Sequence, residues 1–211
     1  IADGPTIQAA DQRALAKKFN VVKAFSLVKK IRKINGNVPI GLLVYSNLIN
    51  SFGTEKFYSA AKKAGVDGVL CADVPIEEAK PFLTAAKKSG ISQIFLIAPT
   101  TTTARMRKIF PNAKGFVYAV SLLGVTGTRK KLGNEVFGLI RNAKKQTKLP
   151  VCAGFGISKP EHIKELLAAG ADGAIIGSAI VKIIGKNAKN RKKMIKEIAG
   201  FCRKMKKATV R

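Results

Sequence analysis

Six short apolar segments recur along the chain, separated by stretches with helical periodicity. The segments are residues 38–45, 68–73, 93–99, 115–121, 150–156 and 173–177. None of them alternates polar with apolar residues, and near-continuous apolarity is typical of strands that are buried on both faces. The helical stretches supply the crossover connections that parallel strands need. The pattern therefore predicts an α/β fold with a parallel sheet.

The predicted helices have recognisable ends. We expect Asn20 to cap the helix that follows it and Gly36 to close that helix. Pro75 is expected to open a helix that runs to Gly90, and Pro160 to open another. Residues 186–211 are expected to form a docked amphipathic helix with a basic outer face, whose apolar side carries Ile195, Ile198, Cys202 and Met205.

Two architectures contain such a pattern, an open doubly wound sheet and a (β/α)8 barrel. A doubly wound dinucleotide fold carries GxGxxG in its first turn, whereas GFGISK occurs late in this chain and has no third glycine. A barrel has eight strands and usually about 250 residues. We therefore expect residues 1–211 to form a single TIM-barrel domain that lacks its first strand–helix–strand unit. The six strands would then be strands 3 to 8 of the barrel.

The chain is strongly basic, with 39 Lys and Arg against 12 Asp and Glu and a formal net charge of +27. Such a charge suggests nucleic-acid binding. The lysines, however, are spread over nearly every predicted helix, and no nucleic-acid-binding motif accompanies them. We interpret the charge as a compositional bias and expect no nucleic-acid partner.

Hydrophobic residues make up 46% of the chain, yet no apolar run has the length of a membrane span. The first residues also lack the basic-then-apolar pattern of a signal peptide. We expect a cytoplasmic protein with no membrane partner.

The cysteine and histidine content argues against a metal site. Cys71, Cys152 and Cys202 are far apart among apolar neighbours, so we expect buried free thiols rather than disulfides or metal ligands. His162 is the only histidine, and its polar surroundings predict a solvated side chain on a helix. The sequence predicts no bound metal.

Glycine and serine occur together at two successive strand-to-helix junctions, GFGIS (154–158) and GSAIV (177–181). Glycine allows a ligand to approach the backbone closely, and a helix N-terminus presents unpaired N–H groups to anions. In barrels, phosphate commonly binds after strands 7 and 8. The pair of junctions favours a phosphate site that includes Ser178. The alternative is that Ser178 only caps its helix and the glycines only form turns.

Three residues lie where a barrel places acid–base groups, at the carboxyl ends of strands: Asp3, Asp73 and Tyr118. For Asp73 the alternative is a simple Asx turn, and for Tyr118 it is core packing with a tethered hydroxyl. The segment 122–134 is glycine-rich, polar and long for a connection, which suggests a lid over the site. A plain solvent-exposed loop is the alternative for that segment.

Six motifs resemble the alpha subunit of tryptophan synthase, and they occur in the family's order from residue 2 to the C-terminal helix. They are ADGPTIQ, PIGLLVYSN, ADVPIEEA, VSLLGVTG, GFGIS and GSAIVKII. The resemblance implies a (β/α)8 barrel. It also implies a lyase of tryptophan biosynthesis that cleaves indole-3-glycerol phosphate to indole and glyceraldehyde 3-phosphate.

The resemblance also assigns roles to individual residues. Asp3 matches the family's second active-site carboxylate, which would hold the indole N–H, and Tyr118 matches a tyrosine near the reacting side chain. Thr126 matches the lid residue that closes against Asp3. The apolar walls of the indole pocket match Leu43, Tyr45, Leu70, Leu96 and Phe155. The phosphate ligands match Gly127, Gly156, Gly177 and Ser178.

By the same resemblance, the chain needs no cofactor of its own and docks on a beta subunit in an alpha2beta2 assembly, with pyridoxal phosphate only on that partner. The family's principal acid–base glutamate lies at the end of the second strand, ahead of ADGPTIQ, and no residue of this sequence corresponds to it. The alternative is therefore a truncated, catalytically inactive protein that still binds phosphate ligands or the beta subunit.

Overall fold

The computed structural model describes residues 3–120, 134–154 and 156–210, and these residues form an α/β fold. Their six strands follow one another in the sheet in chain order, and the pairs β1–β2, β2–β3 and β5–β6 are parallel. The chain divides into two compact units. One unit comprises Lys18–Leu96 and Thr103–Val117, and the other comprises Ile1–Lys17, Ile97–Thr102 and Tyr118–Arg211. We call them the β1–β3 unit and the α9 unit.

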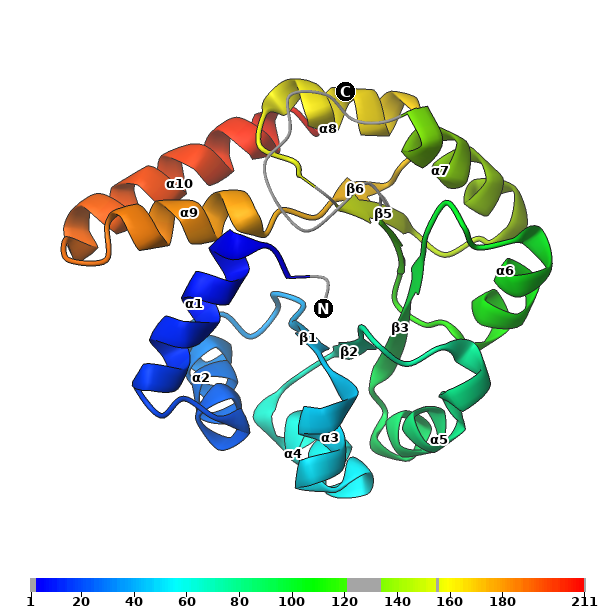
Figure 1. Cartoon of the computed structure of the whole chain (residues 1–211), viewed down its shortest axis with the longest axis horizontal. Coiled ribbons are helices and arrows are strands. Elements are labelled where there is room, and N and C mark those ends of the chain that lie inside the picture. Colours follow the sequence, from blue (N-terminus) through cyan, green and yellow to red (C-terminus); the bar gives the residue numbers. More distant parts are fainter. Residues whose placement is uncertain (1–2, 121–133, 155, 211) are drawn as a thin grey trace. The chain divides into compact units, whose positions relative to one another are not determined.

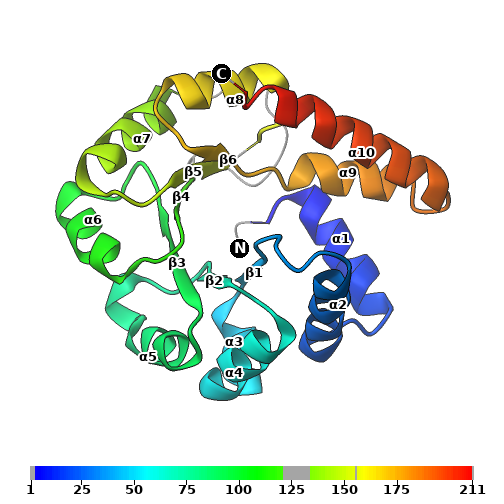
Figure 2. The same cartoon turned by 180° about the vertical axis from the view of Figure 1, so that it is seen from behind.

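The β1–β3 unit alternates strands with helices (Figures 1 and 2). Its strands are β1 (Gly41–Val44), β2 (Gly68–Cys71) and β3 (Ser92–Ile97), and only the last residue of β3, Ile97, belongs to the α9 unit. Its helices are α2 (Val21–Ile34), α3 (Ser46–Phe52), α4 (Thr54–Ala64), the short 3-10 helix η1 (Ile76–Glu78), α5 (Lys80–Ser89), α6 (Thr103–Ile109) and the 3-10 helix η2 (Phe110–Asn112).

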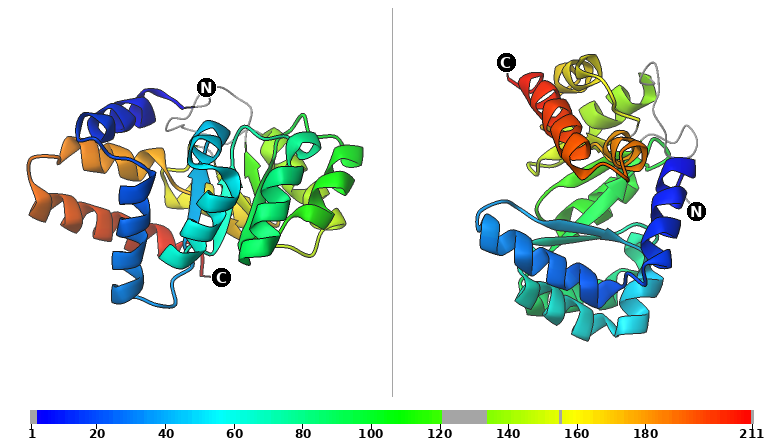
Figure 3. Two further views of the ribbon diagram at one scale, coloured as in Figure 1. Left: turned by 90° about the horizontal axis from the view of Figure 1, so that it is seen from below. Right: turned by 90° about the vertical axis from the view of Figure 1, so that its left-hand side faces the viewer.

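The α9 unit carries the remaining elements. Its strands are β4 (Val117–Val120), which begins at the unit boundary, β5 (Val151–Gly154) and β6 (Gly173–Ala174). Its helices are α1 (Pro5–Ala16), α7 (Asn134–Gln146), α8 (Pro160–Ala168), α9 (Ser178–Lys186) and α10 (Arg191–Lys207). Helix α7 packs on β5 and α8 on β6, whereas α9 packs against both α1 and α10 (Figure 3).

The sheet of the β1–β3 unit has two different faces. One face packs on the helices through Leu42, Val44, Val69 and Cys71, which join a core that includes Phe57 and other helix residues. Leu43 and Leu70 are register partners on the opposite face, because successive side chains of a strand alternate. This second face points away from the helices that cover β1 and β2.

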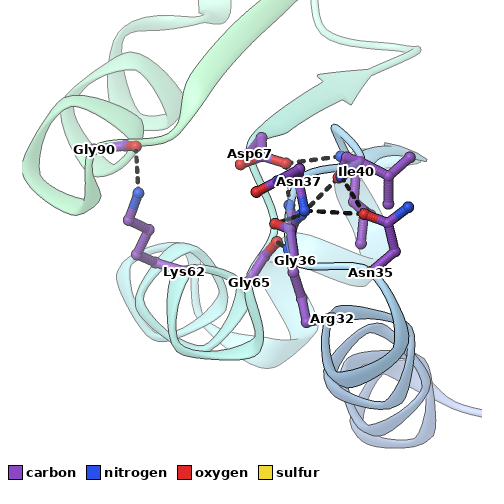
Figure 4. A network of polar contacts seen from close by, with 10 residues as sticks. Arg32, Asn35, Gly36, Asn37, Ile40, Lys62, Gly65, Asp67 and Gly90 are labelled. Carbon is purple, nitrogen blue, oxygen red and sulfur yellow. Dashed lines mark hydrogen bonds and ion pairs between the residues drawn. The ribbon is translucent and has the colours of Figure 1, made fainter.

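A partly exposed side-chain clamp holds the amino ends of β1 and β2 in register (Figure 4). Arg32 donates hydrogen bonds to the carbonyls of Gly65 and Val38, at 2.7 and 2.6 Å, and forms an ion pair with Asp67. The same Asp67 carboxylate accepts the N–H of Ile40 at 2.7 Å. One arginine thus ties the end of α2 to the starts of two strands, since a guanidinium presents several donors in a fixed plane.

The α9 unit repeats this clamp. Asp172 accepts the N–H of Val151, the first residue of β5, at 2.7 Å, and Lys144 of α7 donates to both oxygens of the carboxylate at 3.1 and 2.8 Å. Each clamp aspartate belongs to an AGxDG motif, residues 64–68 in one unit and 169–173 in the other. In both motifs the first glycine has a positive φ, 97° and 99°, and follows the end of a helix. In each motif the first glycine follows the end of a helix, the aspartate accepts an N–H at the start of a strand, and the second glycine begins the next strand.

The observed elements confirm the six predicted strands, although β6 is reduced to two residues. Asn20 caps α2 as predicted, with its side chain accepting the N–H of Lys23 at 3.0 Å. The predicted helix after Pro75 is instead two elements, η1 and α5, because Pro81 occupies the first turn of a new helix. Among the described residues, no helix is both long and apolar enough to cross a membrane.

Three predictions about burial are wrong in whole or in part. His162 is buried rather than solvated, with 2% of its surface exposed. Cys202 is exposed, whereas Cys71 is buried and Cys152 is half-buried. The C-terminal helix exists as α10, but of its predicted apolar side only Met205 is buried, and Ile195 is 54% exposed. The apolar side of α10 is therefore less buried than the sequence pattern indicates.

Candidate active site

The loop that carries Asp3 is fixed to the first turn of α1. Pro5 occupies the first position of the helix, where its missing N–H costs no hydrogen bond. The carbonyl of Gly4 accepts the N–H groups of Ile7 and Gln8, both at 3.0 Å. The side chain of Gln8 reaches back and donates to the Asp3 carbonyl at 2.7 Å. The ADGPTIQ sequence thus presents the Asp3 carboxylate from a fixed backbone at the positive end of a helix dipole.

Asp11 of α1 is a carboxylate whose pKa is affected by the charge of Asp3. Burial, followed by the negative charge of Asp3, raises the pKa of Asp11 above its ordinary value. A second acidic side chain on α1 therefore lies within electrostatic reach of the Asp3 loop.

Tyr118 of β4 lies directly over Gly154 of β5. A methyl group on Gly154 would be 2.5 Å from the phenolic oxygen of Tyr118 and 2.8 Å from Cβ of Ile175. The absence of a side chain on Gly154 is therefore what leaves room for the phenol. Burial raises the pKa of Tyr118, so the phenol remains protonated at neutral pH and can donate a hydrogen bond.

The start of α9 has the features of an anion site. Gly177 is the N-cap residue, and no side chain caps the helix. The carbonyl of Gly177 accepts the N–H groups of Ile180 and Val181, while Ser178, the first helical residue, is half-buried. The interpretation of Ser178 as a simple helix cap is therefore wrong. Its hydroxyl and the first amides of α9 have the arrangement that helix N-termini offer to phosphate.

The loop after β5 carries the second glycine junction. Gly156 has a φ of 68°, a left-handed conformation that favours glycine. Two residues later, the N–H of Ser158 donates to Nδ1 of the buried His162 at 3.4 Å. His162 thus anchors the loop from the first turn of α8, a role that its polar sequence neighbours concealed.

The Asp3 loop at the start of α1 and the anion site at the start of α9 belong to the same unit. The two helices pack against each other side by side (Figures 1 and 3). At the contact, the guanidinium of Arg13 lies over Gly185, where a Cβ would be 3.5 Å from one of its nitrogens. Asp3, Tyr118, Gly156, Gly177 and Ser178 all belong to this α9 unit.

The predicted apolar wall residues belong to the β1–β3 unit. Leu43 and Leu70 lie opposite each other on the face that points away from the helices, and Leu96 follows two residues after Ile94, the register partner of Leu70. Leu70 is buried, whereas Leu43 is 57% exposed on the strand at the end of the sheet order. Tyr45 follows β1 and is half-buried.

Three predicted site residues, Thr126, Gly127 and Phe155, lie outside the described residues, as does most of the predicted lid segment. Within the described ranges, no group of three or more His, Cys, Asp or Glu residues is arranged to hold a metal ion.

Asp73 proves to be part of a polar cluster that the sequence did not reveal. Its carboxylate accepts both the N–H and the hydroxyl of Ser46, each at 2.8 Å, and the thiol of Cys71 at 3.4 Å. Burial by itself raises the pKa of Asp73, but the hydrogen bonds from Ser46 and Cys71 outweigh burial and lower it. Burial and the same carboxylate raise the pKa of Cys71 to about 12. The only sequence signal is a serine after one strand and an aspartate after the next.

Comparison with known proteins identifies the family. The family model described as "Tryptophan synthase alpha chain" matches residues 1–210. The chain belongs to the tryptophan synthase alpha chain family. Its order of motifs and its six-stranded α/β fold agree with that assignment.

Relatives of the tryptophan synthase alpha chain family are similar over most of this chain. The tryptophan synthase alpha chain of Methanothermobacter thermautotrophicus is 46% identical over 198 residues, which are 94% of this chain and 73% of that protein. The alpha chain of Methanocaldococcus jannaschii is 50% identical over 187 residues, 89% of this chain and 66% of that protein. A chain of the tryptophan synthase a2b2 complex from Pyrococcus furiosus superposes with a TM-score of 0.88 at 41% identity, over 97% of this chain and 81% of that one.

Proposed function

We propose that the chain contributes strands 3 to 8 of a (β/α)8 barrel that cleaves indole-3-glycerol phosphate to indole and glyceraldehyde 3-phosphate. The observation that carries the proposal is the α9 unit, in which a fixed aspartate loop, a protonated tyrosine and an uncapped glycine–serine helix start belong to one compact body. Carbon–carbon cleavage in an indole that carries a glycerol phosphate chain uses all three: a carboxylate for the ring N–H, a hydrogen-bond donor for the side chain and an anion site for the phosphate.

The chemistry assigns a role to Asp3. Protonation of indole C3 makes the ring cationic, and loss of the side-chain hydroxyl proton lets the carbon–carbon bond break. The bonding electron pair returns to the ring, which leaves as indole, while the hydroxyl carbon becomes the aldehyde. A carboxylate that holds the ring N–H stabilises the cationic ring electrostatically, and this is the part proposed for Asp3. Tyr118 would donate a hydrogen bond to the reacting side chain.

Phosphate binding is the role proposed for the glycine and serine junctions. Gly156, Gly177 and Ser178, together with Gly127, would hold the phosphate through backbone N–H groups and one hydroxyl. Thr126 would close against Asp3 from the lid. The wall residues Leu43, Tyr45, Leu70, Leu96 and Phe155 would enclose the indole ring, because apolar side chains are what most ligand pockets offer to a flat hydrophobic group.

The proposed barrel requires two further strands. β1 lies at one end of the sheet order, and its residue Leu43 is 57% exposed, which fits a strand that pairs with a further strand on its open edge. We propose that a strand–helix–strand unit pairs with β1 and carries the acid–base carboxylate of the reaction. The matched residues make up 73% and 66% of the lengths of two relatives, which leaves room for such a unit in those proteins.

The proposed enzyme uses no metal and no cofactor of its own. Its proposed partner is a tryptophan synthase beta subunit, since a similar chain occurs in the a2b2 complex from Pyrococcus furiosus. Pyridoxal phosphate would be bound by that subunit alone.

Indole release from indole-3-glycerol phosphate tests the proposal. In a protein with a complete barrel, Asp3→Asn is expected to abolish release while the circular dichroism spectrum is unchanged. Asp11→Asn is the matched control, because it removes a neighbouring carboxylate of α1 that has no assigned contact with substrate, and it should retain release. Equal turnover by parent and Asp3→Asn would remove Asp3 from the mechanism.

The same assay distinguishes the proposed lyase from a second hypothesis, a catalytically inactive protein that binds phosphate ligands or the beta subunit. That hypothesis predicts binding of glycerol 3-phosphate at α9 without indole release from any complete form of the protein.

A further inference from the structure

The carboxyl ends of β1 and β2 are joined by one carboxylate. Asp73, two residues after β2, accepts the N–H of Ser46 at one oxygen and the hydroxyl of Ser46 at the other, both at 2.8 Å. The thiol of Cys71, the last residue of β2, donates to the same carboxylate at 3.4 Å. Hydrogen bonds to a charged acceptor are stronger than neutral ones. We call these three residues the Asp73 clamp.

The Asp73 clamp supplies a cap that the local sequence does not. Helix α3 begins at Ser46, and its N-cap residue is Tyr45, which makes no side-chain cap hydrogen bond. A tyrosine cannot reach its own helix amides as a short polar side chain does. The carboxylate of Asp73 instead reaches across from the next strand and lies at the positive end of α3.

This arrangement fixes the backbone on both sides of Tyr45. Before it, the carbonyl of Val44 accepts the N–H of Ala72 at 2.9 Å, and after it Ser46 is held through both its N–H and its hydroxyl. The residues on either side of Tyr45 are therefore both hydrogen-bonded to residues that follow β2. The register of β1 and β2 themselves is set by their strand pairing.

We propose that Asp73 is a positioning residue, which acts through Ser46 to hold Tyr45 in the orientation that forms one wall of the indole pocket. The inference rests on the proposed function for the role of Tyr45, but not for the clamp itself. Asp73 touches neither the reacting atoms nor the phosphate in this account, and its contribution is to the affinity for the indole ring.

The chain offers a clean spectroscopic test, since it has three tyrosines and no tryptophan. Protein labelled with 3-fluorotyrosine should give three 19F resonances, which Tyr→Phe variants assign to Tyr45, Tyr58 and Tyr118. Ser46→Ala removes one hydroxyl of the clamp and is expected to shift or broaden the Tyr45 resonance alone. Ser51→Ala is the matched control, because Ser51 of the same helix donates only to Asn47 within that helix, at 2.7 Å.

Ligand titrations of the same samples separate positioning from general loss of structure. Ser46→Ala is expected to weaken indole binding by up to roughly tenfold. Indole must then order Tyr45 as it binds, and the cost of that ordering is limited to the hydrogen bond to a charged group that held the residue in place. Binding of glycerol 3-phosphate, which uses α9, should not change. Ser46→Thr keeps the hydroxyl and should restore indole binding, and Ser51→Ala should bind both ligands as the parent does.

Two results would overturn the proposal. One is a Tyr45 resonance and an indole affinity that Ser46→Ala leaves at the parent values. The other is an equal loss of affinity for indole and glycerol 3-phosphate, which would mark the clamp as a general stabilising contact. If the parent binds no indole, the proposed function fails, whereas the Tyr45 resonance still decides whether the clamp holds that residue.

Discussion

Ser178 is the residue at which the proposed phosphate site can be tested in isolation. Ser178→Ala is expected to weaken glycerol 3-phosphate binding roughly tenfold, because one hydrogen bond to a charged group is lost while the helix amides remain. Isothermal titration measures the change. Ser26→Ala, whose hydroxyl bonds only to the Val22 carbonyl of its own helix, is the control and should bind as the parent does. Unaltered affinity in Ser178→Ala would count against the assignment.

The contact between Gly154 and Tyr118 predicts how a substitution of Gly154 changes stability. Gly154→Ala would place a methyl group 2.5 Å from the phenolic oxygen, so either the ring or the strand must move. Such overpacking is expected to lower the free energy of unfolding by roughly 1–3 kcal/mol.

Gly138 provides the matched control for Gly154. It lies exposed within α7, and a Cβ there meets nothing within 4 Å. Gly138→Ala should raise the free energy of unfolding by up to about 1 kcal/mol, since alanine favours a helix more than glycine does. Urea denaturation compares the two variants, and equal stability would show that Tyr118 does not depend on the bare backbone of Gly154.

At the scale of elements, the clamps at the amino ends of the strands set the register of the sheet. Arg32→Lys is expected to lower the free energy of unfolding by roughly 1–3 kcal/mol, because an ammonium cannot reach the carbonyls of Gly65 and Val38 and the Asp67 carboxylate together.

An exposed ion pair gives the contrast. Lys88 pairs with Glu55 at 3.0 Å, and both side chains are about two-thirds exposed, at 70% and 68%. Lys88→Ala should therefore change stability by less than about 1 kcal/mol. Thermal denaturation of both variants decides the matter, and a loss in Arg32→Lys no larger than in Lys88→Ala would contradict the role of the clamp.

The elements were largely predictable from local pattern, and the contacts between them were not. Continuous apolar runs located all six strands, and Asn20 and Gly90 located helix ends, because these signals act within a few residues. The burial of His162 and the exposure of Ile195 depend on what packs against α8 and α10, which local sequence does not contain. The Asp73 clamp was missed for the same reason, since it joins residues 27 positions apart.

At the scale of the whole molecule, the order of motifs carried more information than the composition did. The net charge of +27 suggested a nucleic-acid binder, yet the lysines are distributed over many helices. Six motifs in the family order led to the assignment that the match over residues 1–210 confirms. The glycine-rich junctions indicated Ser178, and its position at a strand end indicated Asp3. The specific roles of these residues came only from the resemblance, because nothing in their neighbours distinguishes a catalytic aspartate from a loop aspartate.

Complementation of the barrel tests the central claim most directly. The chain would be joined at Ile1 to the first strand–helix–strand unit of the Methanothermobacter thermautotrophicus relative, and indole release from indole-3-glycerol phosphate would be measured with and without Asp3→Asn. We predict release by the joined protein and none by its Asp3→Asn form. A joined protein that folds and binds glycerol 3-phosphate but releases no indole, or releases it equally without Asp3, would contradict the account.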